Sequence, residues 1–232
     1  MRVGIIAALK EEIDPLVRSM EDVETSKWGR RTIHQGKTGD CQVVAVSGGV
    51  GKVKAAACTQ YLIDRFSLDA LICTGVAGAV NPRLQTGDVV ISEKTLQHDF
   101  DPGDPELLKK FRKRWVQADA GLVKLAREAA RELGLADRCH AGKMLTGDQA
   151  IVSQERRQWL WKTFRGDCVD MESAAVAQVC QMNGVPWVIV RAISDSAEED
   201  SIAEFRRNLA DCGADAARLA LGVLGGMSQV GW

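Results

Sequence analysis

Acidic side chains lie at both ends of one short segment, residues 169–197. Asp170 and Glu172 open the segment, and Arg191 and Asp195 close it. A carboxyl group in an apolar pocket can hold a proton near neutral pH and donate it, while a second carboxylate can accept hydrogen bonds or a proton. These residue types therefore predict acid–base chemistry on a small molecule.

Another acidic pair follows the first apolar run of the chain. Glu11 and Glu12 come directly after residues 3–8, which we predict to be a buried strand, and they fall in the first turn of the next helix. Two interpretations stay open. The helix dipole favours acids in a first turn, or one of the two carboxylates supplies chemistry at the carboxyl end of the strand.

The acidic residues of segment 169–197 must be positioned by a helix and a strand. Small residues from Ala174 to Cys180 predict a helix packed tightly on a sheet, and Gly184 predicts its end. Pro186 then opens an unbroken apolar strand, 187–190, which is typical of a sheet covered on both faces. Arg191, Ser194 and Asp195 follow it, at the strand end where α/β proteins bind ligands.

Two glycine-rich turns follow other predicted strands. Residues 47–52 (SGGVGK) precede a helix but match neither the dinucleotide-binding nor the Walker pattern. Residues 74–79 (TGVAGA) end the strand that begins at Leu71. Such turns either let a ligand approach the backbone or simply connect a strand tightly to the next element.

The remaining pattern alternates strands and helices. It predicts a hairpin over 30–47, strands at 71–74, 87–92 and 143–146, helices over 53–66 and 120–134, a helix capped by Ser153, and a helix that starts in a capping box at Ser201-x-x-Glu204 and ends near Leu224. The acidic loop 98–105 is either a lid or plain surface. We therefore expect one α/β domain over residues 1–232, a three-layer α/β/α fold around a mixed, largely parallel twisted sheet.

Composition excludes several classes of function. Lys and Arg number 30 against 31 Asp and Glu, so neither nucleic acid nor a membrane surface is an expected partner. Seven scattered cysteines without a CxxC pair indicate reduced core thiols in the cytoplasm. The three histidines are far apart, so we expect no metal and no cofactor. Without an apolar run of eighteen residues, neither secretion nor a membrane span is expected.

Several motifs together resemble one family, the purine nucleoside phosphorylase and nucleosidase superfamily, and within it the 5′-methylthioadenosine/S-adenosylhomocysteine nucleosidases. The resemblance runs from residue 3 to about 222. It is carried by Gly4-Ile5-Ile6 with Glu12, Gly48-x-x-Gly51-Lys52, Thr74-Gly75-x-Ala77-Gly78, Gly87-Asp88, Val169-x-Met171-Glu172 and Val190-Arg191-Ala192-Ile193-Ser194-Asp195.

The resemblance implies roles for individual residues. Asp195 corresponds to the acid that protonates N7 of a purine, and Glu172 to the carboxylate that binds the ribose hydroxyls. Glu12 corresponds to the base that activates water, with Arg191 nearby, and Met171 packs on the sugar. Further substrate-binding positions are Leu9, Val50, Val76, Gly78, Ile151, Arg191, Ser194 and Phe205. The family's members are dimers, so we also expect a homodimer.

This chain departs from the family pattern in three places. Val76 replaces a serine whose hydroxyl helps to hold water, and the sequence Gln149-Ala150-Ile151 lacks the aromatic residue that stacks on the purine. The loop around 102–105 is shorter and richer in proline. The base and the group at the 5′ position are therefore left open.

Three hypotheses follow. The first is a hydrolase that splits a purine nucleoside with a modified 5′ position. The second is a phosphorylase, or a nucleosidase for another modified nucleoside such as futalosine. The third is a nucleoside-binding module without turnover, which would not need the three carboxylates. The helix after Ser173 is apolar on nearly every side, which predicts a second apolar partner and supports a homodimer.

Overall fold

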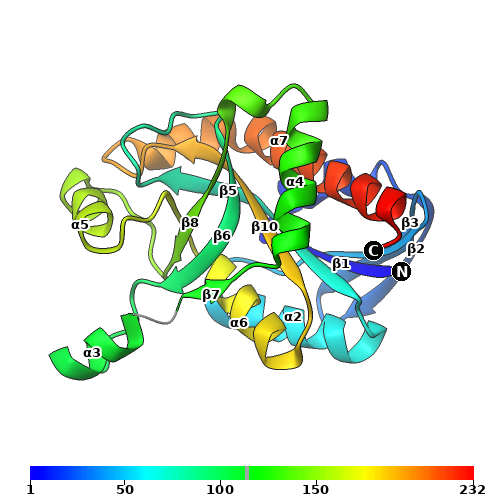
Figure 1. Cartoon of the computed structure of the whole chain (residues 1–232), viewed down its shortest axis with the longest axis horizontal. Coiled ribbons are helices and arrows are strands. Elements are labelled where there is room, and N and C mark those ends of the chain that lie inside the picture. Colours follow the sequence, from blue (N-terminus) through cyan, green and yellow to red (C-terminus); the bar gives the residue numbers. More distant parts are fainter. Residues whose placement is uncertain (113–114) are drawn as a thin grey trace.

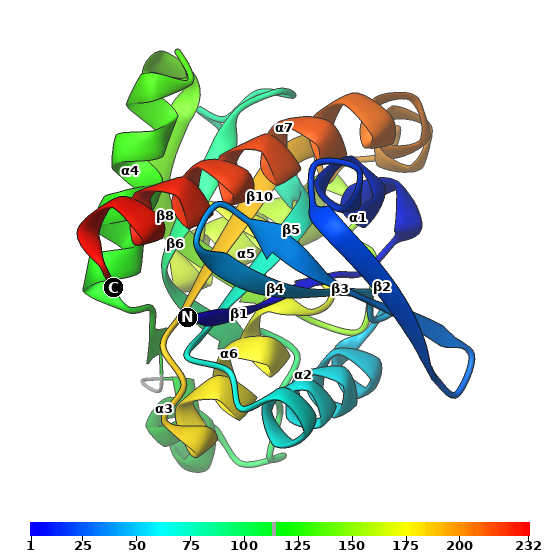
Figure 2. The same cartoon turned by 90° about the vertical axis from the view of Figure 1, so that its right-hand side faces the viewer.

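The computed structural model describes residues 1–112 and 115–232 and has helices on both faces of one twisted sheet (Figures 1 and 2). The strands are β1 (Arg2–Ala7), β2 (Glu21–Trp28), β3 (Arg31–Thr38), β4 (Cys41–Ser47), β5 (Ala70–Ala79), β6 (Val89–Gln97), β7 (Val116–Gln117), β8 (Cys139–Thr146), β9 (Cys168–Asp170) and β10 (Trp187–Asp195). The helices are α1 (Lys10–Val17), α2 (Lys52–Phe66), α3 (Pro105–Arg112), α4 (Ala120–Glu132), α5 (Gln154–Phe164), α6 (Ser173–Asn183) and α7 (Ser201–Val230), with a 3-10 turn at Ala136–Arg138.

The sheet is mixed and partly closed. Its order is β10-β6-β8-β9-β5-β1-β4-β3-β2, and β10 also pairs with β5. Strands β4, β1, β5 and β10 run parallel, as do β6, β8 and β9, whereas β10 is antiparallel to β6 and β9 to β5. The prediction of an α/β fold with a mixed sheet between helices is confirmed.

Two cores lie on opposite faces of the sheet, because successive side chains of a strand point to opposite sides. In β1, Val3 and Ile5 pack towards α1, α4 and α7, whereas Ile6 packs towards α2 and α6. Figure 2 shows the two helical layers with the sheet between them. Because helices pack on both faces of the sheet, the neighbouring strands β1, β5 and β10 are held in place, and so are the residues at their carboxyl ends.

Helix ends were predicted with mixed success. Ser153 caps α5 as expected, since its hydroxyl accepts a hydrogen bond from the Arg156 amide. The predicted capping box at Ser201 is wrong: Ser201 is already inside α7, and its hydroxyl donates to the carbonyl of Ile151 at 3.3 Å. Glu204 instead accepts a hydrogen bond from the Ser196 amide at 2.7 Å.

Two strands are longer than the sequence indicated. Strand β10 continues through Arg191 to Asp195, and β5 continues through the second glycine turn to Ala79, because each pairs with the other over this length. The polar residues that we expected after β10 therefore lie within it. Strand β2 was not predicted at all.

Helix α6 has its apolar partner within the chain. The side chains of Val176, Ala177 and Cys180 are fully buried against α2 and the sheet. The argument that α6 needs a second subunit is therefore wrong, because α2 covers the face in question.

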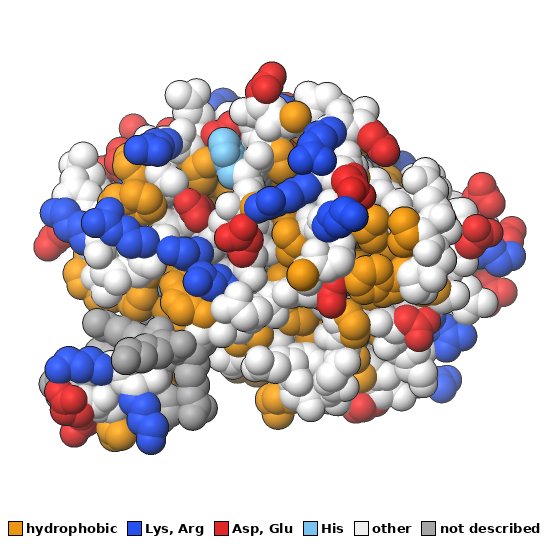
Figure 3. Space-filling view, in the orientation of Figure 1, with side chains coloured by type: hydrophobic (Ala, Val, Ile, Leu, Met, Phe, Trp, Pro, Cys, Tyr) orange, Lys and Arg blue, Asp and Glu red, His pale blue; other side chains and the backbone are white. Residues whose placement is uncertain are grey.

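Charged side chains of both signs are interspersed on the face shown in Figure 3, in line with nearly equal numbers of acidic and basic residues. Among the helices of residues 1–112 and 115–232, none has both the length and the apolar character to cross a membrane.

Candidate active site

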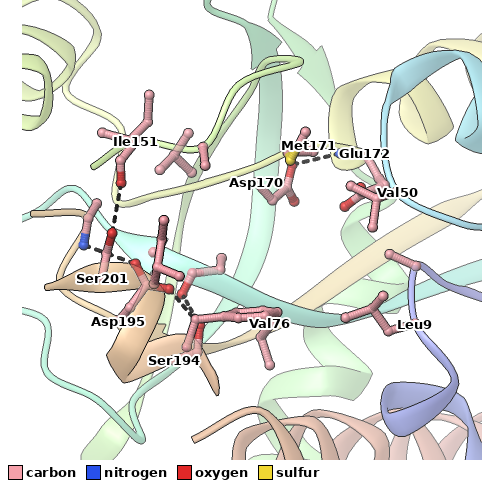
Figure 4. A pocket seen from close by; sticks show the side chains of 18 of the residues that line it. Leu9, Val50, Val76, Ile151, Asp170, Met171, Glu172, Ser194, Asp195 and Ser201 are labelled. Atoms are coloured by element: carbon pink, nitrogen blue, oxygen red, sulfur yellow. Dashed lines mark hydrogen bonds between the residues drawn. The ribbon is translucent and has the colours of Figure 1, made fainter. Parts of the chain in front are cut away.

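A cavity of about 450 Å³ opens at the carboxyl ends of β1, β5 and β10. Figure 4 shows Asp195 and Ile151 at one end of it and Leu9 and Val50 at the other. Nearly all of the predicted site residues line this cavity. They are Leu9, Glu12, Val50, Val76, Gly78, Ile151, Met171, Glu172, Ser194, Asp195 and Phe205.

Glu12 is held at the start of α1 by three backbone amides. Its Oε2 accepts hydrogen bonds from Ala8 at 2.9 Å and Leu9 at 2.8 Å, and its Oε1 accepts one from Val76 at 3.0 Å. Burial raises the pKa of Glu12, although the charge of Arg191 and the three amides lower it in part. A fixed, buried carboxylate with a raised pKa is a suitable base for water.

Gly75 lets β5 pass close to Glu12. A Cβ at this position would lie 2.4 Å from Arg191 Nη1 and 2.6 Å from Glu12 Oε1, and φ is +150°. Any side chain would displace one of these two groups. The first glycine of the TGVAG turn is thus required by the packing of charged groups behind the cavity.

Arg191 does not line the cavity, which differs from its predicted role in substrate binding. Its side chain is 1% exposed and lies on the α6 side of β10, where its Nε is 2.8 Å from Asp170 Oδ2 and its Nη2 is 3.5 Å from Glu172 Oε2. Burial alone would lower the pKa of Arg191, but Asp170, Cys73, Glu172 and Glu12 raise it, so the guanidinium stays charged. It acts by holding the carboxylates in place.

Glu172 lies between Arg191 and the turn before α2. Its Oε1 accepts a hydrogen bond of 2.9 Å from the Gly51 amide. Burial raises its pKa to about 7, and the charge of Arg191 opposes that shift while Asp170 adds to it. This carboxyl group therefore changes its protonation near neutral pH and can accept or donate hydrogen bonds to hydroxyl groups.

Asp195 ends β10 at the other end of the cavity. Its Oδ2 accepts a hydrogen bond of 2.7 Å from the Ser194 hydroxyl, and its Oδ1 accepts one of 3.0 Å from the Ala197 amide. A Cβ at Gly78 would lie 2.8 Å from Oδ1, so glycine is needed there. Burial raises the pKa of Asp195, against the effect of the Ser194 bond, which suits a proton donor.

The rest of the wall is mostly apolar. Val76 points its side chain into the cavity, and Ala150 occupies the loop where the family has an aromatic ring. Two of the three departures from the family pattern therefore fall on the cavity surface. They leave the carboxylates in place and change what surrounds the bound molecule.

Sequence reasoning missed part of the wall. Ser201, Ile202 and Arg206 also line the cavity, on the first turns of α7. Their spacing around Phe205, which we did predict, places all four on one side of a helix, and this signal was available in the sequence. Among the described residues that line the cavity, Arg206 is the one cation.

The chain matches the model of the phosphorylase superfamily over residues 2–225. It is 36% identical over 236 residues to a 5′-methylthioadenosine/S-adenosylhomocysteine nucleosidase from Oceanobacillus iheyensis, covering 97% of this chain and 99% of that protein. It is 33% identical over 208 residues to an aminodeoxyfutalosine nucleosidase from Campylobacter jejuni, covering 88% of this chain and 90% of that protein.

A solved structure gives the same result. The 5′-methylthioadenosine/S-adenosylhomocysteine nucleosidase from Neisseria meningitidis, in complex with methylthio-immucillin-A, superposes with a TM-score of 0.89 at 33% identity and covers 96% of this chain and 98% of that one. The resemblance drawn from the sequence motifs is confirmed. With this fold, this arrangement of carboxylates and a family match over nearly its whole length, the chain belongs to the phosphorylase superfamily.

Proposed function

We propose that this protein hydrolyses the N-glycosidic bond of purine nucleosides with a modified 5′ position, namely 5′-methylthioadenosine, S-adenosylhomocysteine or a related adenosine, and releases the free base. The observation that supports this most directly is that three buried carboxyl groups with raised pKa values, Glu12, Glu172 and Asp195, line one cavity of nucleoside size. The nucleosidases among its relatives point to the same chemistry.

Each carboxyl group has a separate task. Asp195, whose pKa is raised by burial, donates a proton to N7 of the base as the bond between the base and the sugar breaks and the electron pair of that bond leaves with the base. Glu172 binds the ribose hydroxyls, and Met171 packs on the sugar. Glu12 takes a proton from water as the water oxygen bonds to the anomeric carbon, which carries positive charge in the transition state.

Water fits the cavity better than phosphate as the nucleophile. The carboxyl groups of Glu12, Asp170, Glu172 and Asp195 line the cavity, and those that are ionised oppose a phosphate anion. The guanidinium of Arg191 is bound to Asp170 and Glu172 behind the wall. Phosphate sites need several free donors. Arg206 is the one cation among the described residues that line the cavity, and Val76 supplies no hydroxyl.

A second candidate is the hydrolysis of aminodeoxyfutalosine or futalosine. It is favoured by the relative from Campylobacter jejuni and by the fold of a futalosine hydrolase from Helicobacter pylori, which superposes with a TM-score of 0.89 at 28% identity over 97% of each chain. The two candidates share the reaction and differ in the 5′ group.

Assembly as a cytoplasmic homodimer is the remaining part of the proposal. We group three exposed apolar residues as one cluster: Val50, which lines the cavity and is 38% exposed, Val53, which is 79% exposed, and Phe100, which is 50% exposed. The ion pair between Lys52 and Asp99 brings the neighbouring residues together. A second subunit would cover this cluster. All seven cysteines are free thiols, which supports a reducing compartment.

Product analysis tests the reaction. The protein is incubated with 5′-methylthioadenosine, S-adenosylhomocysteine, aminodeoxyfutalosine, adenosine and inosine, with and without phosphate, and the products are separated by chromatography. We expect adenine and free 5′-substituted ribose at a rate independent of phosphate. Formation of a sugar phosphate that depends on phosphate would identify a phosphorylase. Binding without any product would identify a nucleoside-binding module.

A further inference from the structure

A network of charged side chains joins the start of α2 to two loops that are distant in sequence. Lys52 Nζ is 2.7 Å from Asp99 Oδ1, and the Lys52 amide donates a hydrogen bond of 2.8 Å to Asp148 Oδ1. The Asp148 amide donates a hydrogen bond of 2.8 Å to Asp99 Oδ2. The three residues therefore form a closed ring of contacts, which we call the Lys52–Asp99–Asp148 clip.

The ion pair of the clip is largely shielded from solvent. The side chains of Lys52 and Asp99 are only 19% and 13% exposed, so water screens their attraction less than on an open surface. His98, next to Asp99, is buried, and burial lowers its pKa to about 4. At neutral pH His98 is uncharged, and Lys52 is the cation bound to Asp99.

The clip supports both sides of the cavity without reaching it. Gly51, directly before Lys52, donates the hydrogen bond of 2.9 Å to Glu172, and Val50 lines the cavity. On the other side, Asp148 is followed by residues 149–151, all of which line the cavity. Lys52, Asp99 and Asp148 are absent from that lining, so the clip lies outside the cavity wall.

A further contact reaches the helix that follows Glu172. Lys52 Nζ donates a hydrogen bond of 3.1 Å to Gln97, and the Gln97 side chain donates one of 2.8 Å to Gln178 on α6. Glu172 is the residue at the N-terminal end of α6. Lys52 is therefore linked to Glu172 by two routes, through the Gly51 amide and through α6.

We propose that Lys52, Asp99 and Asp148 are positioning residues that hold the Gly51 amide on Glu172 and so determine how tightly the cavity binds the sugar hydroxyls. The inference rests on the proposed role of Glu172. An ion pair that only stabilises the fold would affect all substrates equally, whereas the clip affects those with the hydroxyls that Glu172 binds.

The test compares kcat/KM for 5′-methylthioadenosine with that for its 3′-deoxy and 2′-deoxy analogues. In the wild-type protein the loss of a bound hydroxyl lowers kcat/KM. In Lys52→Met we expect kcat/KM for the full nucleoside to fall about tenfold, with a much smaller fall for the deoxy analogue that lacks the bound hydroxyl. Lys37→Met is the matched control, because it removes an exposed ion pair with Asp22 on the hairpin of β2 and β3.

A second variant covers the case in which Lys52→Met does not fold. Asp99→Asn keeps one side-chain oxygen that can accept the hydrogen bond of the Asp148 amide, but it loses the negative charge and the second oxygen that accepts from Lys52. Like Lys52→Met, it should therefore reduce the preference for the nucleoside that carries the bound hydroxyl. The proposal would be overturned if a folded clip variant had a lower melting temperature but kept the wild-type ratio of kcat/KM between 5′-methylthioadenosine and its deoxy analogues.

The underlying assumptions fail in distinguishable ways. If the wild-type protein releases no base, the proposed function is wrong. If Glu172→Gln leaves the preference for the hydroxyl intact, the role of Glu172 is wrong. If Glu172→Gln removes that preference and the clip variants do not change it, only the inference about the clip is wrong.

Discussion

The backbone amide of Val76 donates a hydrogen bond of 3.0 Å to Glu12 Oε1, although the two residues are 64 positions apart in the sequence. Because this bond uses the backbone of residue 76, replacing the family's serine by valine leaves it intact. The replacement changes the cavity instead, where the Val76 side chain presents methyl groups next to the carboxylate that is proposed to activate water.

Val76→Ser restores a hydroxyl beside Glu12. A neutral hydrogen bond is worth about 0.5–1.5 kcal/mol, so an added bond to the attacking water should raise kcat by about two- to tenfold. Steady-state kinetics on 5′-methylthioadenosine measure the effect. Val76→Ala removes the same methyl groups without adding a hydroxyl and is the control; an equal gain in both variants would mean that space, and not the hydroxyl, limits the rate.

Glu12→Gln should lower hydrolysis by about 10²–10⁴-fold, the range for a lost general base. It should also lower the free energy of unfolding by about 1–3 kcal/mol, because the amide nitrogen cannot accept a bond from the backbone amides that now bind the carboxylate. Calorimetry should still detect nucleoside binding. The exposed neighbour variant Glu11→Gln should show neither loss, and full activity in Glu12→Gln would contradict the assignment.

Asp195→Asn cannot donate a proton to the base, so kcat should fall by about 10²–10⁴-fold while binding persists. Rapid-quench measurement of base release separates the chemical step from product release. Asp211→Asn, on the exposed side of α7, should leave the rate unchanged. With a substrate whose base leaves easily without protonation, Asp195→Asn should lose less activity than with 5′-methylthioadenosine. An equal loss with the two substrates would argue against Asp195 as the proton donor.

The charge on Glu172 should make stability depend on pH. Its pKa is about 7 in the folded protein against an ordinary value of 4.5, so the folded state binds the proton more tightly. The stability contributed by this group is fully present below about pH 4.5 and is lost as pH rises through about 7. Glu172→Gln stays uncharged, so its melting temperature relative to wild type should rise between pH 5 and 8. If the difference in melting temperature between Glu172→Gln and the wild-type protein stays constant from pH 5 to pH 8, the raised pKa of Glu172 is contradicted.

A homodimer should sediment at about twice the chain mass of 25.2 kDa at micromolar concentration. A stable interface buries at least about 1,200 Å², and Val53→Glu in the exposed cluster beside the cavity should weaken it. Met182→Glu changes another exposed apolar residue, on α6, and should leave the mass unchanged. A fully active monomer would exclude an assembly in which both subunits are needed.

The sequence predicts the centre of the fold better than its edge. Strands β1, β5 and β10 are recognised from apolar runs because both of their faces are buried. Strand β2 has no such pattern, since nearly all of its residues are exposed and only its pairing with β3 makes it a strand. An exposed edge strand depends on its neighbour, which a local pattern does not contain.

The sequence also predicts which residues gather at the cavity but not which way every side chain turns. Asp195 was singled out because a charge directly after an apolar strand is unusual, whereas Glu12 was distinguished from Glu11 only by the family resemblance. Arg191 carries the same signal, yet it does not line the cavity and its guanidinium binds Asp170. Lys52 was noticed only as the end of a glycine-rich turn, because its partners Asp99 and Asp148 are far from it in sequence.

The central position of β5 also fixes when the cavity can form during synthesis. One edge of β5 pairs with β1, near the N-terminus, and the other with β10, residues 187–195. Until the ribosome has released that last strand, β5 presents an open edge of unpaired backbone groups between mostly apolar side chains, which is prone to wrong pairing and aggregation. The nascent chain therefore passes most of its synthesis without a site and completes it only with the final fifth of its length.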